Sequence, residues 1–212
     1  MIDLSLAAKL FAALFAIMGP LSTVPIFLAL TEDLDAAGRR SALLALLATV
    51  SIGALVCALA GNWVLALFGI DVAHFRLAGG LLVLLIALSM LNGEEHASHK
   101  GTPGEQTQYR AADNPGIYPL GLPLSLGPGT MATIIVYADS ARSRAEVAGF
   151  YTGLAVYLAF FAAVMLLAPW LGTRLSPTVL SVAKRLMGIV LAAIAMEMIG
   201  DALGVIFPGW LH

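Results

Sequence analysis

The chain has 212 residues, of which 60% are hydrophobic and only 11% charged, and its mean hydropathy is +0.93 with a formal net charge of −2. Soluble domains carry about 25% charged residues, so this composition excludes an ordinary water-soluble domain, and the small net charge argues against a nucleic-acid partner. The single cysteine, Cys57, excludes an intrachain disulfide.

Six apolar segments, each long enough to cross a bilayer, fill most of the sequence. A transmembrane helix needs about 20 mainly apolar residues. The first segment begins near the start of the chain, but Asp3 precedes it and no clear cleavage site follows, so we expect a retained helix and not a signal peptide. The predicted spans are residues 5–30, 42–68, 75–92, 116–138, 146–169 and 179–206.

The two halves of the sequence carry the same two signatures at nearly the same spacing. Gly19-Pro20 in the first span returns as Gly127-Pro128 in the fourth, 108 positions later. Arg76-Leu77-Ala78-Gly79 in the third span returns as Arg185-Leu186-Met187-Gly188 in the sixth, 109 positions later. An offset shared across three spans indicates a duplicated three-helix unit. Because three is odd, the second copy would be inverted in the membrane, as in many secondary transporters.

These features predict an all-α integral membrane protein with six transmembrane helices, arranged as two inverted three-helix repeats with broken helices 1 and 4. The first repeat covers residues 1–92 and the second covers residues 116–212. Residues 93–115 between the repeats are polar with scattered Gly and Pro, which predicts a solvent-exposed loop.

The distribution of Lys and Arg predicts the orientation in the membrane. Seven of these residues lie on the side of the connections after spans 1, 3 and 5, and four lie on the other side. Basic residues are enriched on the cytoplasmic side, so we expect a cytoplasmic 93–115 loop and both termini outside. The seven are Arg39, Arg40, Lys100, Arg110, Arg174, Lys184 and Arg185, and the four are Lys9, Arg76, Arg142 and Arg144.

The two Gly-Pro breaks form the predicted substrate site. Proline frees backbone groups that lipid cannot satisfy, so a break is tolerated only inside protein or beside a water-filled cavity. A half-helix that begins at proline presents free N–H groups and the positive end of its dipole, which attract a carboxylate. Carbonyls near Met18 and Leu126 would then hold an amine; the alternative is two proline kinks without a ligand. The predicted substrate-binding residues are Gly19, Pro20, Leu21, Ser22, Thr23, Gly127, Pro128, Gly129, Thr130 and Thr133.

Three charged residues in the spans are further candidates. Glu197 lies in the apolar last span, with Asp201 one turn further on the same face, and burial beside a second acid would make it a proton-coupling group. The alternative is a neutral or paired structural acid, for which Arg76 and Lys184 are distant partners. Arg76 and Arg185 open corresponding spans and could pair with acids or bind lipid headgroups, although snorkelling to the interface is the more ordinary behaviour.

Enzyme signatures are absent from the sequence. It contains no His-Glu-x-x-His, no Gly-x-Ser-x-Gly, no P-loop and no Cys-x-x-Cys. We therefore expect a protein that is not an enzyme and that uses no cofactor and no metal.

Three stretches of the chain resemble the MarC family of membrane proteins. The stretch Gly19–Thr31 resembles the first family signature, Pro119–Thr133 the second, and Arg185–Ile199 the last span. The resemblance implies a six-span inner-membrane protein, distantly similar to LysE-type exporters. Through the SnatA-like branch it implies transport of small neutral amino acids such as glycine and alanine with an ion gradient. Family members usually have Asn or Asp where this chain has Gly19, and often Gln where it has Glu197.

Together these observations predict a secondary transporter of small solutes, with glycine- or alanine-sized neutral amino acids as the favoured substrates. It would work by alternating access at a site between the two half-helix breaks. The expected partners are the substrate, the lipid bilayer and a coupling proton or sodium ion, and the expected location is the bacterial inner membrane. An uncoupled exporter or pore and a non-transporting membrane accessory protein remain the alternatives.

Overall fold

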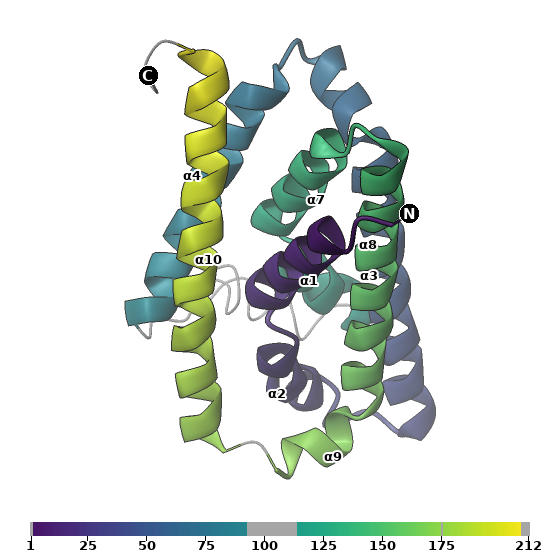
Figure 1. The fold of residues 1–212 in the computed structure, drawn as a ribbon. Helices are drawn as coiled ribbons and strands as arrows, with labels where there is room; N and C mark the ends of the chain where they lie inside the picture. Colours follow the sequence, from purple (N-terminus) through teal and green to yellow (C-terminus); the bar gives the residue numbers. More distant parts are fainter. Residues whose placement is uncertain (1, 93–113, 175, 209–212) are drawn as a thin grey trace.

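The computed structural model describes residues 2–92, 114–174 and 176–208, and every regular element in these ranges is a helix (Figure 1). Apart from its last two residues, the predicted 93–115 loop lies outside the described residues. The elements are α1 (Leu4–Met18), α2 (Pro20–Leu30), α3 (Ala36–Leu67), α4 (Val72–Asn92), the irregular helical segment η1 (Gly116–Ser125), α7 (Pro128–Ser140), α8 (Arg144–Leu166), α9 (Ala168–Gly172) and α10 (Pro177–Ile206).

Five helical stretches in the described chain are long and apolar enough to cross a membrane. They are Leu4–Leu30, Ala36–Leu67, Val72–Asn92, Arg144–Leu166 and Thr178–Ile206. A sixth candidate is the pair η1 and α7, which are bent by 62° at a short break. The predicted class, an all-α membrane protein with up to six spans and a broken fourth span, is confirmed.

The second span begins earlier than its apolar residues predicted, at Ala36 and not at residue 42. Asp35 explains the difference, because its carboxylate accepts a hydrogen bond of 2.7 Å from the Gly38 amide and caps the helix before the apolar run starts. Polar residues therefore form the first turns of α3, outside the hydrophobic segment.

The first span is broken at Gly19. This residue has φ +50°, a conformation that glycine adopts without steric cost, and its amide donates to the carbonyl of Phe15 at 3.2 Å. Pro20 then occupies the first position of α2, where its missing N–H is not needed. The sequence thus ends one helix and starts the next within two residues.

Two long helices, α4 and α10, pack against each other in opposite directions along one edge of the molecule (Figure 1). A Cβ atom added to Gly80 would lie 3.2 Å from the carbonyl oxygen of Ala195, and one added to Gly188 would lie 3.1 Å from that of Ala87. Glycine at both positions lets the two backbones approach closely, as in many membrane helix pairs.

The broken helices pack on helices from the opposite half of the chain. Gly153 of α8 lies against Ala7 of α1, and Leu126 after η1 lies against Gly53 of α3. Figure 1 shows α1, α2 and α7 between the α4–α10 pair and the helices α3 and α8. Half of the first span is buried, compared with 22% of α3, α4 and α10. The first break therefore lies in the most buried of these spans, whereas the second is open on one side, since Pro128 is exposed.

We expect Gly153→Ala to loosen the contact between α1 and α8. The added Cβ would lie 2.7 Å from the carbonyl oxygen of Ala7 and 2.9 Å from its Cα, and backbone atoms cannot move aside as a side chain can. Overpacking of this kind costs about 1–3 kcal/mol. Thermal unfolding of the purified protein in detergent should show a lower midpoint.

Gly200→Ala is the matched control, because nothing lies within 4 Å of a Cβ added there. The control should be neutral or slightly stabilising, since alanine favours helix more than glycine does. Equal midpoints for the two variants would contradict the close α1–α8 packing.

Candidate functional site

The second break separates η1 from α7. Extended backbone at Tyr118 and Leu122, each followed by proline, makes η1 irregular. Gly127 precedes α7, Pro128 begins it, and no described side chain caps its N-terminal amides. The hydroxyl of Thr130 instead donates to the carbonyl of Ser125, before the break, at 3.1 Å. A side chain therefore satisfies a carbonyl that the interrupted helix leaves without its usual donor.

The first break uses the same device. The Thr23 hydroxyl lies 3.4 Å from the carbonyl oxygen of Met18 and 3.3 Å from that of Gly19, so it donates back across the break. The α2 N-terminus has no side-chain cap among the described residues. The Met18 carbonyl, predicted to hold an amine, thus already has a donor from within the chain.

The structure brings the two breaks next to each other through α1. A Cβ atom added to Gly129 would lie 2.9 Å from the Cδ1 atoms of Ile17 and Ile86. Ile17 stands two residues before Gly19, so the start of α7 faces the end of α1. These isoleucines fill the space in front of Gly129.

The predicted substrate residues differ in burial. Pro20, Thr23, Gly129, Thr130 and Thr133 are buried. Gly19, Leu21, Ser22 and Gly127 are half-buried, and Pro128 is exposed. The Thr133 hydroxyl donates to the carbonyl of Gly129 within its own helix at 2.9 Å.

Ser125 was not among the predicted residues, but it is the most unusual polar group at the breaks. Its side chain is fully buried, and its hydroxyl has no hydrogen-bond partner among the described residues. An unpaired buried hydroxyl is costly. Its place in the run Leu124-Ser125-Leu126, directly before the Gly-Pro break, was the available sequence signal.

Glu197 has a partner that the sequence did not predict. The Nζ atom of Lys9 on α1 lies 2.9 Å from its Oε1 atom, and about half of each side chain is exposed. The expectation that pairing would need Arg76 or Lys184 is wrong in its choice of partner. Lys9 is 188 positions away in sequence, so only the packing of α1 beside α10 brings the two together.

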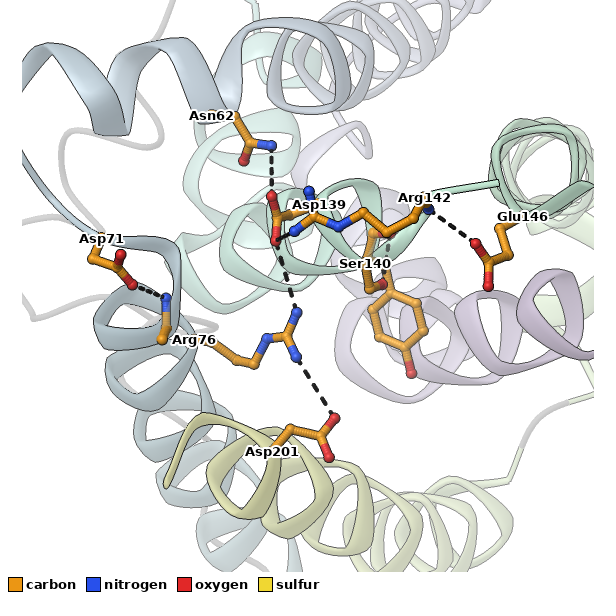
Figure 2. A network of polar contacts seen from close by, with 10 residues as sticks. Asn62, Asp71, Arg76, Asp139, Ser140, Arg142, Glu146 and Asp201 are labelled. Carbon is orange, nitrogen blue, oxygen red and sulfur yellow. Dashed lines mark hydrogen bonds and ion pairs between the residues drawn. The ribbon is translucent and has the colours of Figure 1, made fainter. Parts of the chain in front are cut away.

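Arg76 lies between two carboxylates, as Figure 2 shows. Its Nη2 is 3.9 Å from Asp139 Oδ2 and its Nη1 is 3.7 Å from Asp201 Oδ2. Only 16% of its side chain is exposed, and of the expectations for Arg76 the structure confirms pairing with acids. Asp139 also accepts hydrogen bonds from Asn62 at 3.1 Å and Arg142 at 3.0 Å.

Two cavities meet at Arg76. The small cavity has a volume of about 290 Å³ and lies among α1, α4, α7, α8 and α10. The large cavity has a volume of about 500 Å³ and lies among α4, the end of α7 and α10. Arg76 and Ser140 line both. The charged residues lining the small cavity are Asp3, Lys9, Arg76, Glu146, Glu197 and Asp201.

Apolar side chains stand between the small cavity and the breaks. Met198 lines the cavity. Behind it lies Gly79: a Cβ atom added to Gly79 would lie 3.6 Å from the Met198 Cε atom and 2.9 Å from the Ala132 Cβ atom. Ile17 and Ile86 follow at the level of Gly129. The cavity is thus separated from the half-helix ends by layers of packed side chains.

The described residues contain no group of three or more His, Cys, Asp or Glu side chains that could hold a metal ion. The polar groups of the candidate site are hydroxyls, backbone amides, carboxylates and two cations. They suit recognition of a charged or zwitterionic small molecule.

Comparisons with known proteins agree with this membrane architecture. The profile of the MarC family of integral membrane proteins matches residues 4–207. The UPF0056 membrane protein YhcE of Escherichia coli is 33% identical over 99% of this chain and 97% of its own length. The UPF0056 membrane protein YvbG of Bacillus subtilis is 32% identical over 96% of this chain and 97% of its own length. No solved structure matches the chain significantly.

Proposed function

The chain belongs to the MarC family of integral membrane proteins, and on that premise we propose that it is a secondary transporter of small solutes. One observation carries the proposal: two interrupted helices from opposite halves of the chain meet at Gly129 and Ile17, inside the bundle. Discontinuous helices at the centre of a bundle are the usual substrate sites of secondary transporters.

The chemistry at the breaks supports a carboxylate-bearing substrate. The first amides of α2 and α7 have no side-chain cap among the described residues, and a helix N-terminus favours negative charge. The fully buried Ser125 hydroxyl is free to bond with a ligand. The first amides of α7 and the Ser125 hydroxyl, which stand on the two sides of the second break, are groups that can bond to the carboxylate of an amino acid.

The favoured substrates are small neutral amino acids, of glycine or alanine size. The space in front of Gly129 is occupied by the ends of two isoleucine side chains, whose rotation would open only a small volume. The resemblance to the SnatA-like branch of the family points to the same substrate class. A large side chain would not fit without separation of α1 from α7.

Alternating access accounts for the layers between the small cavity and the breaks. In the present conformation the cavity is open at one end of the bundle, and the Ile17 and Ile86 side chains fill the space beside Gly129. Movement of α1 and α7 relative to α4 would connect the cavity with the breaks. An uncoupled pore is the less favoured alternative, because a pore needs a continuous polar path and these side chains interrupt it.

We expect Gly129→Ala to reduce transport strongly while the protein still folds. The new methyl group would meet only the flexible ends of Ile17 and Ile86, but it would occupy the space before the first amides of α7. Uptake of radiolabelled glycine or alanine into proteoliposomes should fall at least about tenfold, the effect of about 1.4 kcal/mol.

Gly200→Ala serves again as the control, since the space around Gly200 is open, and it should transport normally. The thermal midpoint of Gly129→Ala should stay near that of the unchanged protein. Normal uptake by Gly129→Ala would refute the half-helix site.

The orientation that we propose puts both termini outside the bacterial inner membrane. The α2–α3 turn and α9 lie at one end of the bundle and the α7–α8 turn at the other (Figure 1). In a Cys57→Ala background, cysteines at the exposed positions Glu32 and His74 should react with an impermeant thiol reagent from the cytoplasmic side and the outside, respectively. Labelling of both from the same side would contradict this topology.

Glu197 is the residue that we propose as the proton carrier. Protonation would neutralise its carboxylate, break the 2.9 Å pair with Lys9 and so link proton binding to the contact between α1 and α10. We expect Glu197→Gln to exchange substrate across the membrane but to lose accumulation driven by a pH gradient.

A suitable control is Glu32→Gln, which makes the same change at an exposed position in the α2–α3 turn. It should accumulate substrate normally. Proton-driven accumulation by Glu197→Gln would leave Glu197 as a structural acid and shift the search to sodium coupling.

A further inference from the structure

We propose that Arg76 is the carboxylate-binding residue of a recognition site for small zwitterions in the small cavity, separate from the half-helix breaks. Only the biological role of this site, capture of a substrate for transport, rests on the proposed transport function. Binding at the site can be measured without transport. The site would capture an α-amino acid at the open end of the bundle before the apolar layers part.

Arg76 is a largely buried cation that makes no hydrogen bond of normal length to any residue that the structure describes. Its two ion-pair distances, 3.9 and 3.7 Å, are longer than a hydrogen bond, for which 2.7–3.2 Å is typical. Its Nε atom is buried without a partner among the described residues. A guanidinium carries five N–H donors in a fixed plane, which matches the two oxygens of a carboxylate. The geometry leaves these donors available to a ligand.

Asp139 does not serve as the full partner of Arg76. Its Oδ2 atom accepts a hydrogen bond of 3.0 Å from Arg142, and its Oδ1 atom accepts one of 3.1 Å from Asn62. Figure 2 shows Arg142 and Asn62 approaching Asp139 from other directions than Arg76. The charge of Asp139 is therefore matched by Arg142, and Arg76 is held in place without being saturated.

Asp201 supplies the opposite charge. Asp201 and Arg76 both line the small cavity. The side chain of Asp201 is 61% exposed, and its Oδ2 atom lies 3.7 Å from Nη1 of Arg76, which is longer than a hydrogen bond. The other acid on that face of α10, Glu197, is already paired with Lys9 at 2.9 Å. Asp201 is thus the carboxylate open to an incoming ammonium group.

An α-amino acid carries both charges on adjacent groups, so it complements the loose pair. Its carboxylate would bond to the guanidinium of Arg76 and its ammonium to Asp201, which replaces one long ion pair with two charge-assisted hydrogen-bonded contacts. Because the zwitterion carries no net charge, its binding and release leave the net charge of the site unchanged. A simple carboxylate or a simple amine would satisfy only one side of the pair.

The test uses purified full-length protein in lipid nanodiscs and labelled glycine and alanine as probes, with affinity measured by scintillation proximity. We expect Arg76→Gln to weaken binding at least about tenfold, the loss of about 1.4 kcal/mol. Arg76→Lys should bind with intermediate affinity, since an ammonium keeps the charge but loses the bidentate geometry. Asp201→Asn should weaken binding of the amino acids, while acetate should compete poorly in every variant.

Arg144→Gln is the matched control. It removes one positive charge at the same end of the bundle, but Arg144 is exposed at the start of α8 and lines neither cavity. Its affinity should stay within about twofold of the unchanged protein. Thermal midpoints identify any variant that fails to fold, in which case Arg76→Lys and Asp201→Asn decide the outcome.

Two results would overturn the proposal: affinity unchanged in both Arg76→Lys and Asp201→Asn, or no binding of either amino acid at millimolar concentration. The outcome is independent of the transport proposal. Binding that depends on Arg76 without any flux would refute transport and keep this site. Flux that depends on Gly129, together with an unchanged KM for transport in the Arg76 variants, would support transport and refute the Arg76 site.

Discussion

Backbone hydrogen bonding in lipid is the constraint on which this structure depends. A helix can be interrupted inside a membrane only where protein supplies partners for the freed amides and carbonyls. Here threonine hydroxyls donate hydrogen bonds to two of the freed carbonyls, from Thr23 at the first break and from Thr130 at the second. The unbroken helices α3, α4 and α8 pack against the broken ones, and glycines such as Gly153 permit this close packing.

The lipid environment also explains where the charged side chains lie. Most charged side chains cannot lie at the centre of a bilayer without a partner or water, and the described network gathers instead at the end of the bundle where α7 meets α8 (Figure 2). Lys9 with Glu197, and Arg142 with Asp139, form short pairs. Arg76 does not, although it is more buried than Lys9. This incomplete pairing of a buried cation beside a cavity is the observation on which the proposed binding site rests.

The breaks and the charged network lie at different depths, which is the arrangement that the proposed transport function needs for recognition at the surface and binding in the interior. Met198 and Gly79 stand between the two levels, with Ile17 and Ile86 beside Gly129. Apolar side chains can change rotamer without breaking a hydrogen bond. Such a layer can therefore open and close at lower cost than a polar one, and it prevents free passage of ions in the closed form.

Hydropathy, Gly-Pro pairs and an isolated acid are local signals, so the amino-acid sequence alone predicts the spans, the two interruptions and the exceptional character of Glu197. Which residues meet depends on how the helices pack. Lys9 joins Glu197, Asn62 joins Asp139, and Arg76 comes to lie between two acids. Each of these partners stands on a different helix, far away in sequence. Hydropathy is insensitive to how a helix is rotated about its axis, so no local pattern reveals which faces turn toward one another; close packing through glycines fixes that rotation.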